Sequence, residues 1–498
     1  MNEFEQLNRK MKEIADIHAA VSLMSWDQEV MMPQGGARMR ARQISTLHGL
    51  AHHKLIHELG PLLESAQSVD SPSDFERLNL KEISRGMKRW TRIPNDHVME
   101  MSRATSEALQ AWVQARKESD FSLFEPHLQK IVELKLRETE YLGFEENPYD
   151  ALIDEYEPGM KASTLEAIFT PFKERLGTLL EAVRQAPQVD DSFLDQPIPA
   201  ESQLAFGKEV VARLGYAMEH GRQDLSAHPF SIGFHPEDVR ITTMVRENDL
   251  REMLYSSIHE AGHAMYEQGL NLDHYGLPAG EYCSLSIHES QSRLWENNVG
   301  RGAAFIGHFF SQMQALYPDN LAGRSADDLF RAVNRVEPGL IRISADELTY
   351  HFHVILRFEI ENALINREVK VSELPDLWNA KVKSYLGLDV PDNARGVLQD
   401  IHWSHGSIGY FPTYSLGSFY AAQLMHFARQ HHPDLDAQFL SGDFSALKSW
   451  LNAQVHGRGR LYNSEELCTM VTGEPLNVNY FIDYAWEKFG RVYGIARA

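Results

Sequence analysis

The chain has 498 residues, 43% of them hydrophobic, which is enough for a large core in one domain or in several lobes. Its formal net charge of −22 at pH 7 argues against nucleic acid or an anionic membrane as a partner, since both favour basic surfaces. Two cysteines, Cys283 and Cys468, allow one disulfide at most and suit a reducing compartment. The N-terminus lacks an apolar signal segment and no apolar run reaches membrane-spanning length, so we expect a cytoplasmic protein.

The first half of the chain is predicted to be helical. Apolar residues recur at helical intervals over 2–30, 37–63, 74–91, 96–118, 126–141 and 163–185. A surface loop with three prolines follows at 186–199. We expect a single domain over 1–498, in which this loop could separate a helical lobe, 1–187, from a catalytic lobe, 188–498.

The pattern changes at 228–245, which is predicted to form strands. Asp238, Arg240 and Thr242 would share one face of a strand, and Val239 and Ile241 the other. The polar face could line a peptide cleft and pair with an extended substrate backbone by strand addition. The alternative is an ordinary solvated strand face.

A helix is predicted at 248–269, and it contains the pattern H-E-x-x-H. Its apolar stripe comprises Leu250, Met253, Leu254, Ile258, Ala261 and Met265. His259 and His263 are four residues apart, so their rings lie on one helix face, where they can hold one metal ion. Glu260 can then act on a bound water, which is the chemistry of a zinc peptidase. Asp249 and Glu252 could form a capping box. The alternative for the pentapeptide is two packed histidines beside a solvated glutamate.

A catalytic zinc needs a third protein ligand. Glu289, near the start of a helix predicted at 286–299, is the strongest candidate. A capping box between Ser286 and Glu289 would explain the same carboxylate without any metal. His288 is a rival ligand, and Glu296 is a rival or an outer partner of the ligands.

Helices are predicted again at 327–336, 345–366, 371–385, 414–430 and 479–493. The segment 392–412 is rich in His, Trp, Tyr and Gly, and such loops often carry function. His402, Tyr410 and Tyr414 could donate hydrogen bonds to a developing oxyanion, although each alone is more typical of a structural role. Arg342 lies between two isoleucines and could bind a C-terminal carboxylate or pair with a core carboxylate such as Asp346.

Six motifs follow one another along the second half of the chain. They are His228-Pro229-Phe230, D-x-R-x-T at 238–242, H-E-x-x-H at 259–263, His288-Glu289-Ser290-Gln291, I-R-x-x-A-D at 341–346 and G-x-x-Q-D-x-H-W at 396–403. Taken together, the motifs resemble the thermostable carboxypeptidase (Taq-type) family of metallocarboxypeptidases, peptidase family M32. The resemblance extends over nearly the whole chain and departs from the family pattern at no motif position.

The resemblance implies a mainly α fold, a large helical peptidase with a long deep groove and a small β-sheet beside the H-E-x-x-H helix. It implies stepwise release of C-terminal amino acids with broad specificity, zinc or in some cases cobalt as the metal, and a homodimer. Glu260 would be the general base and acid, and Arg342 the carboxylate anchor. The metal ligands would be His259, His263 and Glu289, and the cleft residues would include His228, Arg240, His402, Tyr410 and Tyr414.

Two other functions are compatible with the residues. An endo-acting oligopeptidase or peptidyl-dipeptidase could use the same site on a similar helical groove fold. A helical binding protein with a degenerate metal site belongs to another class, and the intact Glu260 argues against it.

Overall fold

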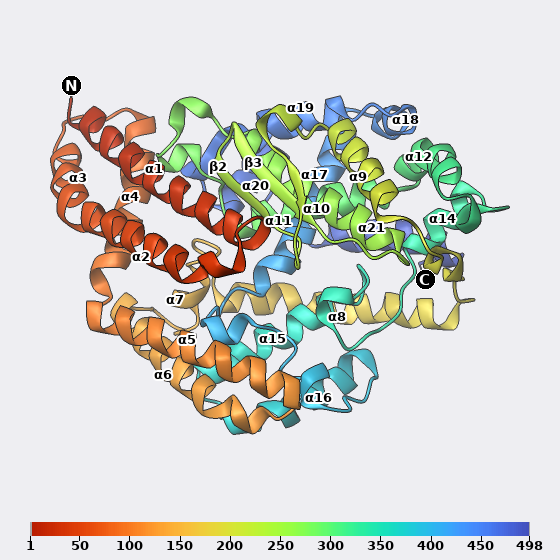
Figure 1. The fold of residues 1–498 in the computed structure, drawn as a ribbon, viewed down its shortest axis with the longest axis horizontal. Coiled ribbons are helices and arrows are strands. Elements are labelled where there is room, and N and C mark those ends of the chain that lie inside the picture. Colours follow the sequence, from red (N-terminus) through yellow and green to blue (C-terminus); the bar gives the residue numbers. More distant parts are fainter. Residues whose placement is uncertain (1, 498) are drawn as a thin grey trace. The chain divides into compact units, whose positions relative to one another are not determined.

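A computed structural model describes residues 2–497. The chain is built mainly of α-helices, with one small three-stranded sheet (Figure 1), which confirms the predicted fold class. It divides into two compact units, each assembled from three separate stretches. Unit 1 comprises Met1–Lys88, Asp190–Val333 and Tyr420–Asn477, and unit 2 comprises Arg89–Val189, Asn334–Phe419 and Val478–Ala498. One division point, between Val189 and Asp190, lies within the loop predicted at 186–199, but neither unit is a continuous lobe.

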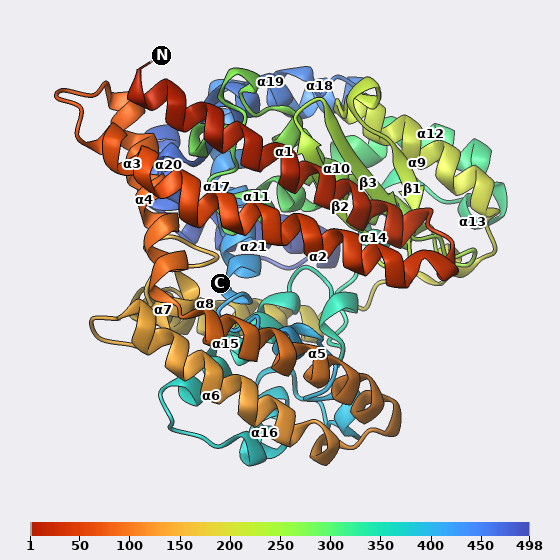
Figure 2. The same cartoon turned by 60° about the vertical axis from the view of Figure 1, so that its left-hand side comes forward.

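Unit 1 holds the sheet and the H-E-x-x-H helix. Helices α1 and α2 run side by side in its N-terminal stretch (Figure 2). The division falls within α4 and α17, so each of these two helices contributes residues to both units. The elements that lie wholly or partly in unit 1 are α1 (Glu3–Val30), α2 (Ala37–His53), α3 (Gly60–Gln67), α4 (Asp74–Arg92), α9 (Ala200–Leu214), β1 (Gln223–Leu225), β2 (Ser231–His235), β3 (Asp238–Thr243), α10 (Leu250–Gln268), α11 (Leu285–Arg293), α12 (Ala303–Leu316), α13 (Pro318–Leu321), α14 (Ala326–Val333), α17 (Pro412–His431), α18 (Leu435–Ser441), α19 (Ser445–Gln454) and α20 (Ser464–Thr472).

The sheet has the order β1-β3-β2, with β1 parallel and β2 antiparallel to β3. The strand predicted to pair with a substrate is therefore the central strand, and neighbours occupy both of its edges. The predicted alternation is also incomplete, because Thr242 is fully buried and accepts a hydrogen bond from the Phe230 amide. A peptide could add only to an edge strand.

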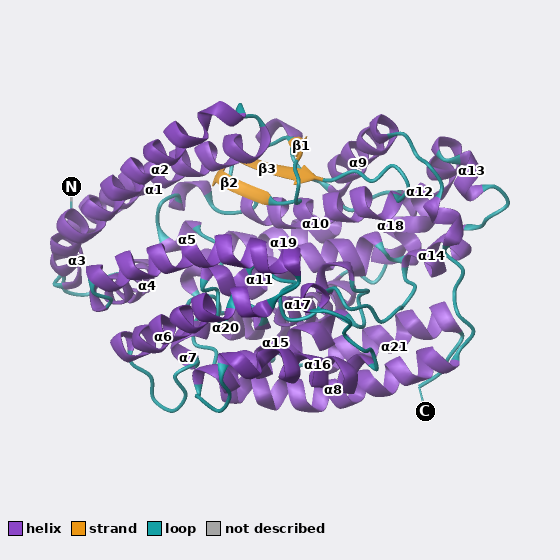
Figure 3. Ribbon diagram, turned by 60° about the horizontal axis from the view of Figure 1, so that its bottom comes forward, coloured by secondary structure: helices purple, strands orange, loops and turns teal. Residues whose placement is uncertain are grey.

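Helix α10 packs against β2 and β3 on one side and against α9 and α11 on others (Figure 3). All six residues of its predicted apolar stripe are buried. Asp249 is the N-cap, but its side chain accepts from the amide of Arg251, and Glu252 pairs with Arg246, so the predicted capping box does not form. The sheet and the neighbouring helices thus fix this helix in the interior of unit 1.

Among its described residues, unit 2 contains helices and connecting loops but no strand. Its remaining elements are α5 (Asn95–Glu118), α6 (Glu125–Leu142), α7 (Asp150–Ile153), α8 (Ala162–Gln185), α15 (Tyr350–Ile365), α16 (Leu374–Leu386) and α21 (Asn479–Tyr493). Helix α15 begins five residues later than predicted because Asp346 ties the preceding turn. Its carboxylate accepts from the amides of Leu348 and Thr349 and from the Thr349 hydroxyl.

Two predicted helices contain π-helical turns that the pattern of apolar residues does not reveal. One lies at Lys54–Leu59, within the segment predicted as a single helix over 37–63. The other lies at Leu294–Gly300 and directly follows α11. Turns of this kind occur often at functional sites. Over residues 2–497, no helix combines the length and the apolar character needed to cross a membrane. Cys283 and Cys468 are both buried and form no disulfide with each other.

Candidate metal centre

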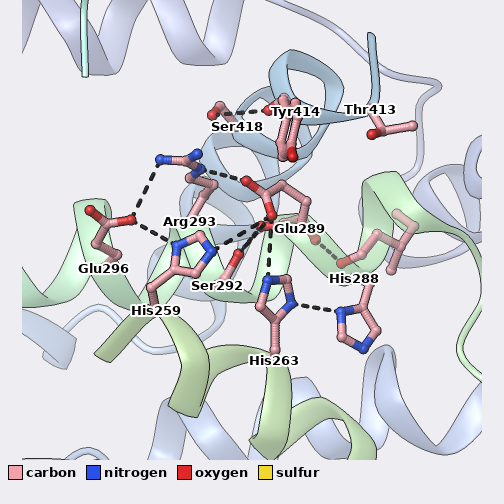
Figure 4. A network of polar contacts seen from close by, with 12 residues as sticks. His259, His263, His288, Glu289, Ser292, Arg293, Glu296, Thr413, Tyr414 and Ser418 are labelled. Atoms are coloured by element: carbon pink, nitrogen blue, oxygen red, sulfur yellow. Dashed lines mark hydrogen bonds and ion pairs between the residues drawn. The ribbon is translucent and has the colours of Figure 1, made fainter. Parts of the chain in front are cut away.

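His259, His263 and Glu289 form a compact group in unit 1 (Figure 4). One potential ligand atom from each lies within 4.8 Å of the other two. Glu289 Oε2 is 3.4 Å from His263 Nε2 and 3.8 Å from His259 Nε2. The two histidines come from one face of α10, as the four-residue spacing predicts, and the glutamate comes from α11.

The backbones of α10 and α11 come unusually close at Gly262. A Cβ at this position would lie 2.6 Å from Ser292 Cα and 2.7 Å from the carbonyl oxygen of Gln291. The glycine between the two histidines therefore lets the two helices approach closely enough for Glu289 to reach both rings.

The start of α11 explains why Glu289 is available. The N-cap is Ser284, whose hydroxyl accepts a hydrogen bond from the amide of Ile287. Ser286 lies inside the helix, so the capping box between Ser286 and Glu289, the alternative explanation for this carboxylate, does not form. Glu289 consequently has no capping role and points toward the histidines.

Partners outside the group orient each ligand atom. His259 Nδ1 lies 2.9 Å from Glu296 Oε2, which leaves Nε2 directed at Glu289. Glu296 lies in the π-helical turn and also contacts Arg301 at 3.2 Å. Glu289 accepts through Oε1 from Arg293 Nε at 2.7 Å, and its Oε2 faces the two histidines and also accepts from the Ser292 hydroxyl at 3.3 Å. Such outer partners fix ring and carboxylate orientation in metal sites.

His263 has a different kind of partner. Its Nδ1 lies 2.6 Å from His288 Nδ1, and His288 Nε2 lies 2.9 Å from Glu267 Oε1. His288, the rival ligand in the sequence, thus has both ring nitrogens in contact with other side chains and is not a member of the convergent group.

Charge interactions follow from this geometry. Burial alone would lower the pKa of His259, but the hydrogen bond to Glu296 and the nearby carboxylates outweigh it and raise that pKa. Burial lowers the pKa of His263 to about 3, which keeps this ring neutral and able to coordinate. Burial opposes ionisation of Glu289, yet Arg293 and the histidines hold its pKa well below the usual range.

Glu260 faces the group from the same helix. Burial raises the pKa of its carboxyl to about 7, with a further raising effect from Glu289 and lowering effects from His259 and from a Ser231 hydrogen bond. A carboxyl in this range can both accept and release a proton near neutral pH.

The three donors suit a divalent metal. Two neutral imidazoles and one carboxylate are the donor set of many catalytic zinc sites, which keep a fourth position open. Bonds of roughly 2.0–2.1 Å in a tetrahedron imply ligand atoms about 3.4 Å apart. The separations of 3.4 and 3.8 Å are close to that value, so the side chains fit the ion with small adjustments.

Two further predicted site residues also lie in unit 1. Arg240, on β3, donates from Nε and Nη2 to the two carboxylate oxygens of Asp238 and stacks over Trp26. His228 is exposed, and its carbonyl accepts from the Ser226 hydroxyl.

The other predicted site residues lie in unit 2, where Arg342 is almost completely buried. Its guanidinium donates twice to Asp400 Oδ1 and once to the Tyr350 hydroxyl, so its partner is Asp400 and not Asp346. Arg357 binds the other oxygen of Asp400 at 2.5 and 2.8 Å. Burial would raise the pKa of Asp400, but the two guanidinium groups hold it well below the usual range. Arg342, Arg357 and Asp400 together carry a net charge of +1.

His402, Tyr410 and Tyr414 form an aromatic group in the same unit. The Tyr414 hydroxyl is 3.4 Å from His402 Nε2, and the Tyr410 and Tyr414 rings have centroids 5.3 Å apart. Arg342 lies 5.0 Å above the Tyr414 ring. Burial lowers the pKa of His402 to about 4, so this imidazole is neutral at pH 7.

Sequence reasoning missed Glu267, Arg293 and Ser231. A signal was present for the first two: Glu267 is four residues after His263, and Arg293 is four residues after Glu289, so each shares a helix face with a ligand. Ser231 contacts Glu260 through the packing of β2 on α10, which no local pattern encodes.

Several proteins of similar sequence and fold are named as carboxypeptidases. Residues 6–489 match the family described as carboxypeptidase Taq (M32) metallopeptidase. Thermostable carboxypeptidase 1 of Thermus thermophilus is 38% identical, over 99% of each chain. Carboxypeptidase 1 of Bacillus subtilis is 37% identical, over 97% of each chain. The crystal structure of the M32 carboxypeptidase from Deinococcus radiodurans superposes with a TM-score of 0.97 at 39% identity, covering 99% of this chain and 100% of that one.

Proposed function

Since the chain belongs to the carboxypeptidase Taq (M32) metallopeptidase family, we propose that this metallocarboxypeptidase uses zinc and releases amino acids one at a time from peptide C-termini with broad specificity. The observation that carries the proposal is the convergence of His259, His263 and Glu289 beside Glu260. Cobalt is the proposed substitute for zinc, because both ions accept imidazole and carboxylate ligands.

In this proposal His259, His263 and Glu289 hold the metal through Nε2, Nε2 and Oε2. When bound, the ion would polarise the scissile carbonyl and make a water molecule acidic enough to attack it. Glu260 would accept the proton of the attacking water and then donate it to the leaving amine. Its buried setting supports this role, because a carboxyl with a pKa of about 7 can perform both transfers.

We assign recognition of the substrate's free carboxylate to Arg342. Support comes from the excess positive charge that Arg342 and Arg357 share around Asp400, since a buried cation in excess favours an anionic ligand. Three of the five guanidinium N–H groups of Arg342 are engaged with Asp400 and Tyr350, which leaves donors for a substrate.

Five further residues are proposed to contact the peptide. Arg240 and His228 are the candidates in unit 1, and His402, Tyr410 and Tyr414 are the candidates in unit 2. The neutral imidazole and the phenol hydroxyls can donate hydrogen bonds to carbonyl oxygens of a peptide.

One experiment tests the central proposal. An unblocked peptide without proline is incubated with the enzyme, and mass spectra are taken over time, with and without a chelator. We expect a ladder of products that differ by single C-terminal residues, loss of the ladder with chelator and recovery with Zn²⁺. Internal fragments or released dipeptides would refute the proposal and favour an oligopeptidase or peptidyl-dipeptidase. If metal analysis finds no bound divalent ion, the result would instead favour a helical binding protein with a degenerate metal site.

A cytoplasmic location and a homodimeric assembly stay predictions. Two buried cysteines that form no disulfide are compatible with a reducing compartment. Cell fractionation tests the location, and sedimentation equilibrium tests the assembly.

A further inference from the structure

The two histidines of α10 are oriented in unequal ways. His259 contacts a carboxylate directly, through Glu296 at 2.9 Å. His263 instead contacts a second imidazole, His288, and reaches a carboxylate only through it, at Glu267. Glu267 lies four residues after His263 on the same helix face, and His288 immediately precedes Glu289 in α11.

We propose that His288 and Glu267 are a positioning pair that fixes His263 with Nε2 toward the metal, and that His288 is not itself a ligand. The inference rests on the proposed metal site, because it assigns a partner to one of its ligands. Neither residue would touch the substrate or the reacting atoms.

The hydrogen-bond roles follow from the chemistry of a ligating imidazole. A neutral His263 that coordinates through Nε2 carries its proton on Nδ1 and donates it to His288 Nδ1. His288 must then carry its own proton on Nε2, where it donates to Glu267 Oε1. Each nitrogen along the chain of bonds thus has one defined role, and only one tautomer of each ring satisfies all the contacts.

Packing holds the His288 ring in the orientation that this chain of bonds requires. The rings of His288 and His263 are inclined by 27°, with centroids 4.5 Å apart. Tyr282 packs against His288 at 4.7 Å, and Tyr266 at 5.5 Å. Arg460 covers Tyr282 in turn. A ring enclosed in this way can set the direction of its neighbour at little cost in side-chain entropy.

Glu267 is confined as well. The backbone of β2 passes so close that a Cβ on Gly233 would lie 3.3 Å from Glu267 Oε2. The side chains of His288 and Glu267 are 14% and 21% exposed, so water competes weakly for their mutual contact. Outer partners of metal-bound histidines typically change metal affinity by about 10–100-fold when removed.

The test compares two amides at position 288. Asparagine can place an amide oxygen where Nδ1 accepts from His263, whereas glutamine places its amide near the position of Nε2. Zn²⁺ dissociation constants are measured on the whole enzyme by competition with a fluorescent chelator, and the absorption spectrum of bound Co²⁺ reports ligand geometry. His308→Ala, which removes a histidine in contact with the Leu440 carbonyl, is the matched control.

We expect His288→Ala and His288→Gln to weaken Zn²⁺ binding about 10–100-fold and to change the Co²⁺ spectrum, while His288→Asn recovers most of the affinity. Glu267→Ala should weaken binding in the same range, and His308→Ala should not. Equal affinity in the wild type and His288→Ala, or in His288→Asn and His288→Gln, would overturn the inference. A loss in His288→Ala as large as in His263→Ala, without recovery in His288→Asn, would make His288 a ligand and overturn it too. If the wild type itself bound no Zn²⁺, the proposed function would fail first.

Discussion

Replacing Gly262 with alanine tests whether the close approach of α10 and α11 builds the metal site. The added Cβ would meet three backbone atoms of α11, at 2.6, 2.7 and 3.0 Å, where ordinary contacts begin at 3.4 Å. Backbone atoms cannot rotate away, so α11 must retreat by about 1 Å. Overpacking of this kind costs about 3 kcal/mol, and the better helix propensity of alanine offsets about 1 kcal/mol of it. The net destabilisation is therefore about 2 kcal/mol.

The same displacement separates Glu289 from His263. Metal–ligand bonds tolerate deviations of about 0.2 Å, so a shift of about 1 Å should weaken Zn²⁺ binding at least about tenfold. The measurements are the melting temperature of the apoenzyme and the Zn²⁺ dissociation constant of each variant.

Gly49→Ala is the matched control, since Gly49 lies inside the exposed part of α2 with no atom within 4 Å of its would-be Cβ. It should raise the melting temperature slightly and leave the Zn²⁺ affinity unchanged. A Gly262→Ala enzyme that melts no earlier than the wild type and binds Zn²⁺ equally well would refute the reasoning.

Three further outcomes are expected. Glu260→Gln should bind Zn²⁺ as tightly as the wild type but lose about 10²–10⁴-fold in kcat, because the amide cannot carry the proton; near-normal turnover would remove Glu260 from the mechanism. Arg342→Ala should lose about 10–100-fold more activity on free-acid peptides than on C-terminal amides, and an equal loss on both would end its role as anchor. Burial, together with the charge of Arg357, lowers the pKa of His353 from 6.5 to about 3, so this imidazole stays neutral in the folded enzyme at pH values where it binds a proton in the unfolded chain. Stability should therefore fall as the pH drops from about 6.5 toward 3, by up to about 1.4 kcal/mol per pH unit from this group. His353→Gln can still donate to the Gly339 carbonyl and should melt with a shallower pH dependence; an unchanged slope would contradict the assignment.

The sequence predicts most helices and the two ligands on α10, because both depend on periodicity within one segment. Local patterns are less reliable for predicting whether Glu289 caps its helix or faces the two histidines. Ser284 and Ser286 both precede Glu289. The capping-box pattern, a serine with a glutamate three residues later, fits Ser286. Ser284 is the cap in the structure, and its hydroxyl also accepts from Ser464, 180 residues away. A choice that depends on so distant a contact cannot be made from the local pattern.

The same limit applies to the partner of Arg342. Asp346 is close in sequence but ties the turn before α15, while Asp400 lies 58 residues away and binds the guanidinium. The division of the chain into two units is likewise invisible in composition, because each unit draws on three stretches and no biased linker separates them.

The discontinuity of unit 1 sets an order of events during synthesis. All three proposed ligands have been made once residue 289 is added, yet Gln291 and Ser284 contact His456 and Ser464, which follow much later. At about 5–20 residues per second, a ribosome needs roughly 10–40 s to synthesise the chain from residue 289 to residue 464. The nascent chain therefore carries its ligands for that time before the contacts that brace α11 can form. We therefore expect stable binding of an ion at the proposed metal centre only late in synthesis, after residue 464 has been added.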